Sequence, residues 1–133
     1  MTDAEYEEQK ARVWHQVERW VPWLGLSWWH ITYNWLRGKS AEDQPNAVIM
    51  METTSRWEYR FATITVFLDS LPDDDSQLER ALVHEYAHIL MGPEEQQLPH
   101  GQNEQYIEAA TENVAQAFLW LKAGIEKETV ERL

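Results

Sequence analysis

The sequence predicts an α+β fold with an N-terminal helix, three to four strands in a mostly antiparallel sheet, and two further helices. Apolar residues recur with helical spacing up to residue 22, alternate with polar residues between 29 and 68, and return to helical spacing after residue 76. Helices gathered on one face of an antiparallel sheet bury both apolar surfaces. A chain of 133 residues is large enough for one hydrophobic core, so we expect a single domain over residues 1–133.

The N-terminal helix is expected to start after Thr2, because Thr2 and Glu5 have the spacing of a capping box. An apolar stripe follows at helical spacing, and Pro22 is expected to close the helix. The stripe consists of Tyr6, Val13, Val17, Trp20 and Val21.

Strands are predicted over residues 29–35 and 47–53, with a polar loop at 38–45 between them. Aromatic residues then alternate from Trp57 to Phe61, and apolar residues alternate in the opposite phase from Ile64 to Leu68. The break in phase near Phe61 and Ala62 indicates a bulge or a turn.

Eight tryptophans are many for this length, and most of them precede residue 60. Tryptophan contributes a large buried area. We therefore expect most of these side chains in the core, with a ligand-stacking row of Trp28, Trp29 and Trp35 as the alternative.

A second helix is predicted from about Gln77 to about Met91. Ser76 and Glu79 have capping-box spacing, residues 73–75 place three aspartates at the positive end of the helix dipole, and Gly92-Pro93 is a stop signal.

The second half of this helix contains His84-Glu85-Tyr86-Ala87-His88, which is the pattern H-E-x-x-H. Two histidines four residues apart project from one helical face and can bind one zinc ion, while Glu85 can take a proton from a water on that ion. Chance gives this pattern about once in forty sequences of this composition. The alternative is two core histidines with ordinary hydrogen-bond partners.

A catalytic zinc site usually has three protein ligands, and without cysteine the third must be His, Glu or Asp. A third helix is predicted from Asn103 to about Lys122, ending at Gly124, with Glu104, Glu108 and Glu112 in one row. Its predicted apolar stripe is Ile107, Ala110, Val114, Ala117, Phe118 and Leu121. Helical spacing alone leaves Glu108 and Glu112 as rival candidates for the third ligand, with His100 as a weaker candidate. The alternative without a metal is that the row of glutamates is a solvent-exposed helix face.

The segments VHEYAHILMGP and EAATENVAQAF together resemble the gluzincin class of zinc metallopeptidases. They are similar in particular to small ImmA/IrrE-like peptidases and to phage-encoded metallopeptidase-like proteins. The resemblance covers about residues 62–121. It implies a minimal zincin-like domain in which Glu108 is the third zinc ligand and Glu112 supports the first histidine. Glu112 departs from the more usual Asp or Asn, and the DNA-binding domain often attached to ImmA-like proteins is not visible.

The resemblance further implies a zinc-dependent peptidase in which His84, His88 and Glu108 hold Zn²⁺ and Glu85 is the general base. An edge strand at 62–69 would pair with an extended peptide, and Tyr106 is a candidate to stabilise the oxyanion. The alternative is a catalytically weak or inactive zincin-fold binding or assembly module of phage or mobile-element origin. A weaker alternative is an inhibitor that is held in a closed state by the loop 94–102.

The net charge of −12 argues against nucleic acid as a partner and is compatible with a peptide or protein substrate. The acidic N-terminus has no apolar signal-peptide core, and no apolar run reaches membrane-spanning length. We therefore expect a cytoplasmic protein without membrane contact.

Overall fold

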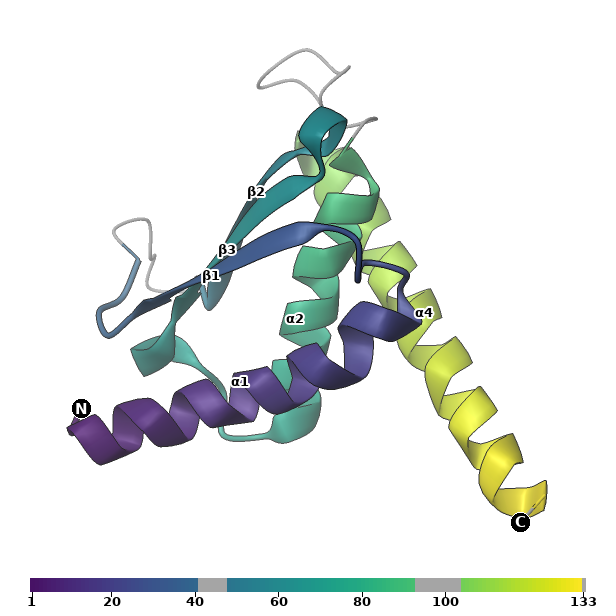
Figure 1. The fold of residues 1–133 in the computed structure, drawn as a ribbon, viewed down its shortest axis with the longest axis horizontal. Coiled ribbons are helices and arrows are strands. Elements are labelled where there is room, and N and C mark those ends of the chain that lie inside the picture. The colour runs from purple at the N-terminus through teal and green to yellow at the C-terminus, as the bar shows by residue number, and fades with distance from the viewer. Residues whose placement is uncertain (41–47, 93–103, 133) are drawn as a thin grey trace.

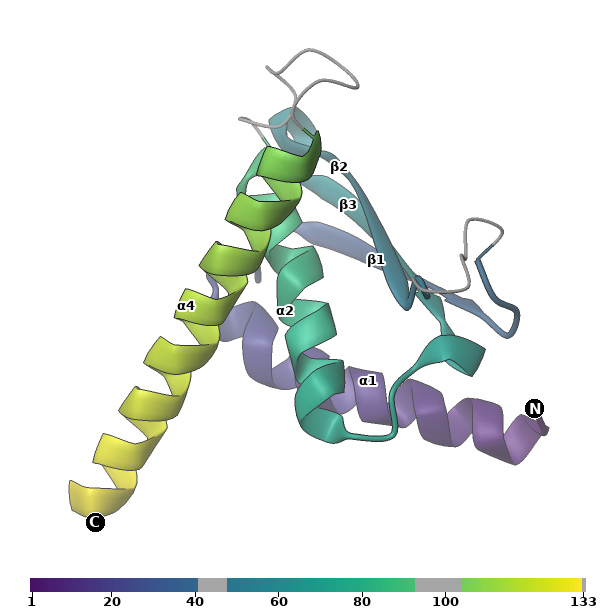
Figure 2. The same ribbon diagram turned by 180° about the vertical axis from the view of Figure 1, so that it is seen from behind.

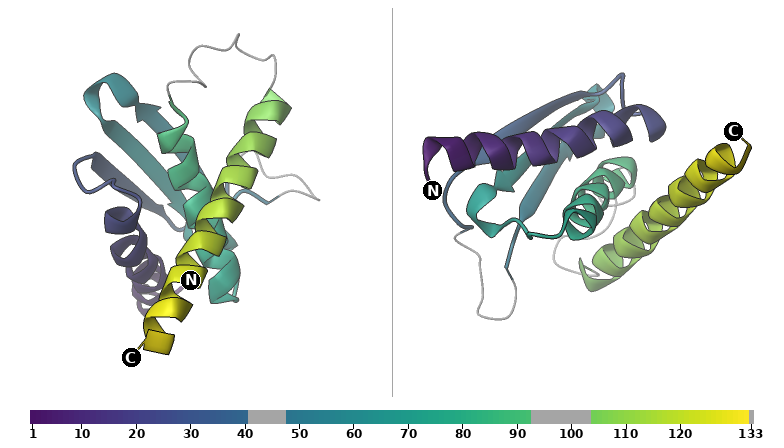
Figure 3. Two further views of the ribbon diagram at one scale, coloured as in Figure 1. Left: turned by 90° about the vertical axis from the view of Figure 1, so that its right-hand side faces the viewer. Right: turned by 90° about the horizontal axis from the view of Figure 1, so that it is seen from below.

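The computed structural model describes residues 1–40, 48–92 and 104–132, and its fold is α+β (Figure 1). Three α-helices and three strands are found in these ranges. They are α1 (Asp3–Trp23), β1 (His30–Leu36), β2 (Met51–Arg56), β3 (Phe61–Phe67), α2 (Asp75–Leu90) and α4 (Glu104–Arg132). Helix α1 lies across one face of the sheet beside α2, and α2 lies between the sheet and α4 (Figure 3).

The sheet is mixed rather than mostly antiparallel, because β3 lies in the centre of the order β1-β3-β2. Strand β1 pairs parallel to β3 from His30↔Phe61 to Leu36↔Phe67, whereas β2 pairs antiparallel to β3. Alternation along a strand indicates which side chains are buried and leaves the pairing of strands open. The central place suits β3, whose Ala62, Ile64 and Val66 are all buried.

Residues Trp57–Tyr59 form a 3-10 turn between β2 and β3, so the strand predicted from the alternating aromatics at 57–61 is wrong there. Arg60 follows with a positive φ of 55°, which reverses the chain direction. The turn therefore lies just before the predicted break in phase.

The edge strand next to α2 is β2, which corrects the expectation for residues 62–69. Because β3 is hydrogen-bonded to a strand on each side, it has no free backbone edge for a peptide. Strand β2 also begins later than expected, at Met51.

Helix α1 starts with the predicted capping box between Thr2 and Glu5. Pro22 lies in its last turn, and the chain leaves the helix at Leu24 and Gly25, with a φ of 71° at Gly25. Val13, Val17 and Trp20 of the predicted stripe are buried in the core.

Helix α2 is capped by Asp74 rather than by Ser76. The Asp74 carboxylate accepts hydrogen bonds from the Ser76 amide and hydroxyl, at 2.7 and 2.6 Å. These bonds lower the pKa of Asp74 below its ordinary value. Glu79, the predicted partner of Ser76, instead accepts a hydrogen bond of 2.9 Å from the indole of Trp20. A buried indole N–H requires an acceptor, and this requirement outweighs the local capping pattern.

One hydrophobic core joins α1, the inner sheet face, α2 and the middle of α4. Only Trp20 of the eight tryptophans is fully buried, so the expectation of a mostly buried tryptophan set is wrong. Those at least 36% exposed are Trp14, Trp23, Trp28, Trp57 and Trp120.

Helix α4 continues through Gly124 to Arg132, beyond the predicted stop, and its far end extends past the other elements (Figure 2). Val114 and Phe118 of the predicted apolar stripe pack against the core, but the rest of the buried side differs from the prediction. Thr111, Ala115 and Lys122 face inward, whereas Ala117 and Leu121 are exposed. No helix in the described part of the chain combines the length and apolarity that crossing a membrane requires.

Candidate metal centre

The two histidines of the H-E-x-x-H pattern lie side by side on α2. Because they are four residues apart on a regular helix, their ring centroids are 4.8 Å apart. Their side chains are 18% and 16% exposed, so both rings are largely shielded from water. The predicted helix and the predicted shared face are therefore both present.

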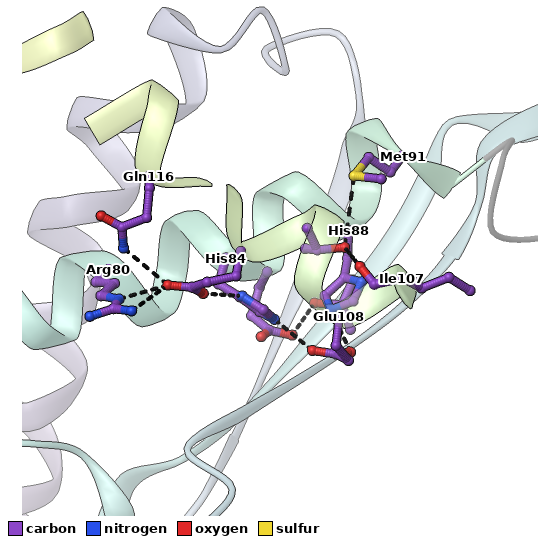
Figure 4. Close-up of polar contacts among 11 residues, drawn as sticks. Arg80, His84, His88, Met91, Ile107, Glu108 and Gln116 are labelled. Atoms are coloured by element: carbon purple, nitrogen blue, oxygen red, sulfur yellow. Dashed lines mark hydrogen bonds and ion pairs between the residues drawn. The ribbon is translucent and has the colours of Figure 1, made fainter. Parts of the chain in front are cut away.

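Glu108 of α4 faces both rings at the level of the histidine pair (Figure 4). One carboxylate oxygen lies 3.1 Å from His84 Nε2, and the other lies 3.1 Å from His88 Nε2. One ligand atom from each of these three residues can be chosen so that all lie within 4.8 Å of one another. The group could therefore hold a metal ion.

Glu112, one turn further along α4, contacts the other nitrogen of His84. Its Oε2 lies 2.8 Å from His84 Nδ1. Its Oε1 accepts hydrogen bonds from Arg80 Nε at 2.8 Å and from Gln116 at 3.0 Å. Burial raises the pKa of Glu112, but the hydrogen bonds from Gln116, Arg80 and His84 outweigh that effect and lower it.

These contacts give the carboxylates of Glu108 and Glu112 different roles. Glu112 is fixed on both oxygens and would orient His84 by accepting its Nδ1 proton, which leaves Nε2 with a lone pair for a ligand role. Glu108, whose side chain is 60% exposed, faces the Nε2 atoms themselves. The geometry therefore favours Glu108 over Glu112 as the third ligand.

Glu85 lies next to this group in a different environment. It is 8% exposed, and its Oε1 accepts a hydrogen bond of 2.7 Å from Thr53 of β2. Burial raises the pKa of Glu85, while the Thr53 hydrogen bond and the two histidines reduce the shift. A raised pKa brings a carboxylate closer to the range in which it can exchange protons near neutral pH.

The group opens into a cleft of about 830 Å³ between α2, α4 and the edge strand β2. The apolar residues that line this cleft include Val48, Ile49, Met50 and Ala81. His84, Glu85, Glu108 and Glu112 also line it, together with Glu52 and Thr54 of β2.

The opposite side of α2 fixes the helix to the core. Val83, Tyr86 and Ala87 are buried, and the Tyr86 hydroxyl lies 2.7 Å from the hydroxyl of Tyr33 on β1. Val83, Tyr86 and Ala87 therefore hold the motif against the core.

Arg80, Thr53 and Gln116 also contribute to this site, and none of the three was predicted from the sequence. Arg80 lies one turn before His84 and Gln116 one turn after Glu112, so helical spacing could have indicated both. Thr53 has no comparable signal, because its contact with Glu85 joins residues 32 positions apart.

The other predicted site residues lie elsewhere. Tyr106 is 73% exposed and does not line the cleft. His100 and the loop 94–102 lie outside the described residues. Trp28 stacks against Arg60 and Trp35 against Tyr33, and within the described ranges no ring contact joins Trp28, Trp29 and Trp35 into a row.

Comparison of the chain with protein-family models, with curated proteins and with solved structures gave no match.

Proposed function

We propose that this chain is a zinc-dependent metallopeptidase, with His84, His88 and Glu108 as the metal ligands and Glu85 as the general base. One observation carries the proposal. One ligand atom from each of His84, His88 and Glu108 can be chosen so that all three lie within 4.8 Å of one another, beside a buried glutamate and in an open cleft. The resemblance of the two helical segments to gluzincins agrees with this assignment of roles.

The residues present suit zinc by chemistry. Two neutral imidazoles and one carboxylate form a ligand set of catalytic zinc sites, which leave a fourth position open for water. Glu112 supplies the outer hydrogen bond that such a histidine usually makes, and Arg80 and Gln116 hold Glu112 in place. Sites with nitrogen and oxygen donors also bind other divalent metal ions. Zinc is therefore the preferred ion among several that this ligand set can accept.

When bound, zinc would lower the pKa of a water molecule and polarise the scissile carbonyl. Glu85 would accept the proton that the attacking water loses and return it to the leaving amine. The hydrogen bond from Thr53 occupies Oε1 of Glu85, which restricts the carboxylate to one orientation. Its low exposure keeps bulk water from competing for that proton.

The substrate would be a peptide in an extended conformation. Strand β2 forms one wall of the cleft, and the strand order leaves its outer edge without a neighbouring strand in the described residues. Backbone groups at such an edge can pair with an added strand. The extended segment would then pass the metal group between β2 and α4.

Metal content is the first test. After zinc loading, the wild-type protein should contain about one zinc per chain by inductively coupled plasma mass spectrometry. His84→Ala, His88→Ala and Glu108→Ala should each lose it, whereas Glu112→Ala should weaken binding about 10–100-fold. His30→Ala and Glu128→Ala alter exposed residues elsewhere and should keep the metal. Absence of zinc from the loaded wild type would refute the site.

The second test distinguishes an enzyme from a metal-dependent binding module. A buried and hydrogen-bonded Glu85 is compatible with a binding module as well. A fluorescence-quenched peptide library should be cleaved by the zinc-loaded wild type and not by Glu85→Gln with its metal retained. Cleavage that survives in Glu85→Gln would exclude the mechanism. Zinc binding without cleavage of any library member would favour the binding module.

A further inference from the structure

Helix α4 has a second apolar side, which faces away from α2. We call this side the outer stripe. Tyr106 is 73%, Trp120 84% and Leu121 58% exposed, which are high values for large apolar side chains. The smaller members of the stripe lie between them on the same side of the helix. They are Ala109, Ala110, Asn113, Ala117 and Gly124.

The outer stripe contains no charged residue over more than four helical turns. The only charged residues between 106 and 124 are Glu108 and Glu112, which face the cleft, and Lys122, which is buried against Trp20. In a chain with a net charge of −12, a face in contact with water would be expected to carry charge. An uncharged surface with large exposed aromatic groups indicates a contact surface instead.

We propose that the outer stripe is the interface of a homodimer, in which α4 packs antiparallel against α4 of a second copy. The two-fold axis passes near residue 115, between Asn113 and Ala117. This association is independent of the metal and of the proposed peptidase activity.

The order of large and small residues along the stripe identifies a second copy as the occupant. An antiparallel pair centred on residue 115 places Tyr106 opposite Gly124 of the other copy. Trp120 and Leu121 then lie opposite Ala110 and Ala109, and Asn113 lies opposite Ala117. Every large side chain faces a small one, and a two-fold interface requires this self-complementary pattern. The matching positions span about 27 Å of helix at 1.5 Å per residue.

The size of the contact predicts a weak dimer. Tyrosine and tryptophan each bury about 150–250 Å² when fully covered, so the two copies of Tyr106 and Trp120 would contribute on the order of 600 Å² or more. With the leucines and the small residues, the total approaches the lower end of specific interfaces. Two chains of net charge −12 also repel each other, so salt should strengthen the association.

Sedimentation velocity of the full chain from about 1 to about 200 µM tests the proposal, because weak dimers dissociate in this range. The wild type should approach twice its monomer mass of 15.8 kDa, more completely at higher salt. Trp120→Glu and Ala117→Glu should each weaken association at least tenfold while their circular dichroism stays unchanged. Trp28→Glu alters a tryptophan that is 64% exposed outside the stripe and should dimerise like the wild type.

Cysteine cross-linking tests the register, since the chain has no cysteine of its own. Oxidation of the double variant Asn113→Cys/Ala117→Cys should give a covalent dimer, because these positions face each other across the axis. The control Asn113→Cys/Gly124→Cys should remain monomeric, since its cysteines would be too far apart in the dimer to join. A wild type that stays monomeric at about 200 µM, or a Trp120→Glu variant that dimerises normally, would overturn the proposal.

Discussion

The hydroxyl pair of Tyr33 and Tyr86 should make an unequal contribution to stability, depending on which hydroxyl is removed. The two oxygens are 2.7 Å apart, Tyr86 is fully buried, and Tyr33 is partly exposed. In Tyr86→Phe, the remaining Tyr33 hydroxyl can reach water, so the loss should be about 1 kcal/mol. In Tyr33→Phe, the Tyr86 hydroxyl stays in the core without its acceptor or donor, and the loss should be about 2 kcal/mol.

The double variant should cost less than the sum of the single variants, because it leaves no unpaired hydroxyl behind. We expect a coupling energy of about 1–2 kcal/mol. Burial raises the pKa of both tyrosines, so both hydroxyls stay neutral at pH 7. Urea unfolding followed by tryptophan fluorescence measures the effect, with a midpoint shift of about 1 M expected for Tyr33→Phe. Equal losses in the two single variants, or strict additivity in the double variant, would refute the reasoning.

Three further predictions concern the metal ligands, the Thr53 hydrogen bond and the Asp74 cap. Zinc at about 100 times its Kd should stabilise the wild type by about 2.7 kcal/mol, seen as a rise of about 10 °C in Tm by calorimetry, and should leave Glu108→Ala unchanged. Thr53→Val should lower the free energy of unfolding by about 1–3 kcal/mol in urea titrations, because Glu85 loses its hydrogen bond in a buried place, whereas Thr53→Ser should restore it. The pKa of Asp74 is lowered by its bonds to Ser76, so its stabilising effect is complete above pH about 4 and is lost as the pH falls through the lowered value. Asp74→Asn keeps the cap without titrating, and its Tm relative to the wild type should therefore rise as the pH falls below about 4. A constant Tm difference across this pH range would contradict the assignment.

Much of the candidate site was predictable because its pattern is local. His84, Glu85 and His88 are on one helix, and helical geometry alone determines their spacing. Glu108 and Glu112 are likewise one turn apart, so the sequence could name both candidates for the facing helix. It could not separate their roles from spacing alone, because that depends on how α4 is rotated against α2. In the structure, Arg80 and Gln116 fix Glu112 against His84 Nδ1 and leave Glu108 opposite the Nε2 atoms.

The sequence by itself determined the α+β class, the order of helices and strands, and the capping box at Thr2, since each depends on neighbours within a few residues. The tertiary structure decided the central place of β3, the choice of β2 as the cleft edge, and the pairing of Glu79 with Trp20 rather than with Ser76. It also decided which side of α4 is buried, because apolar residues occur on two sides of that helix and only packing against α2 selects one. Each of these features depends on contacts between residues that are distant in the sequence. Such contacts are determined by burial and hydrogen bonding in the assembled fold, so a local sequence pattern does not predict them.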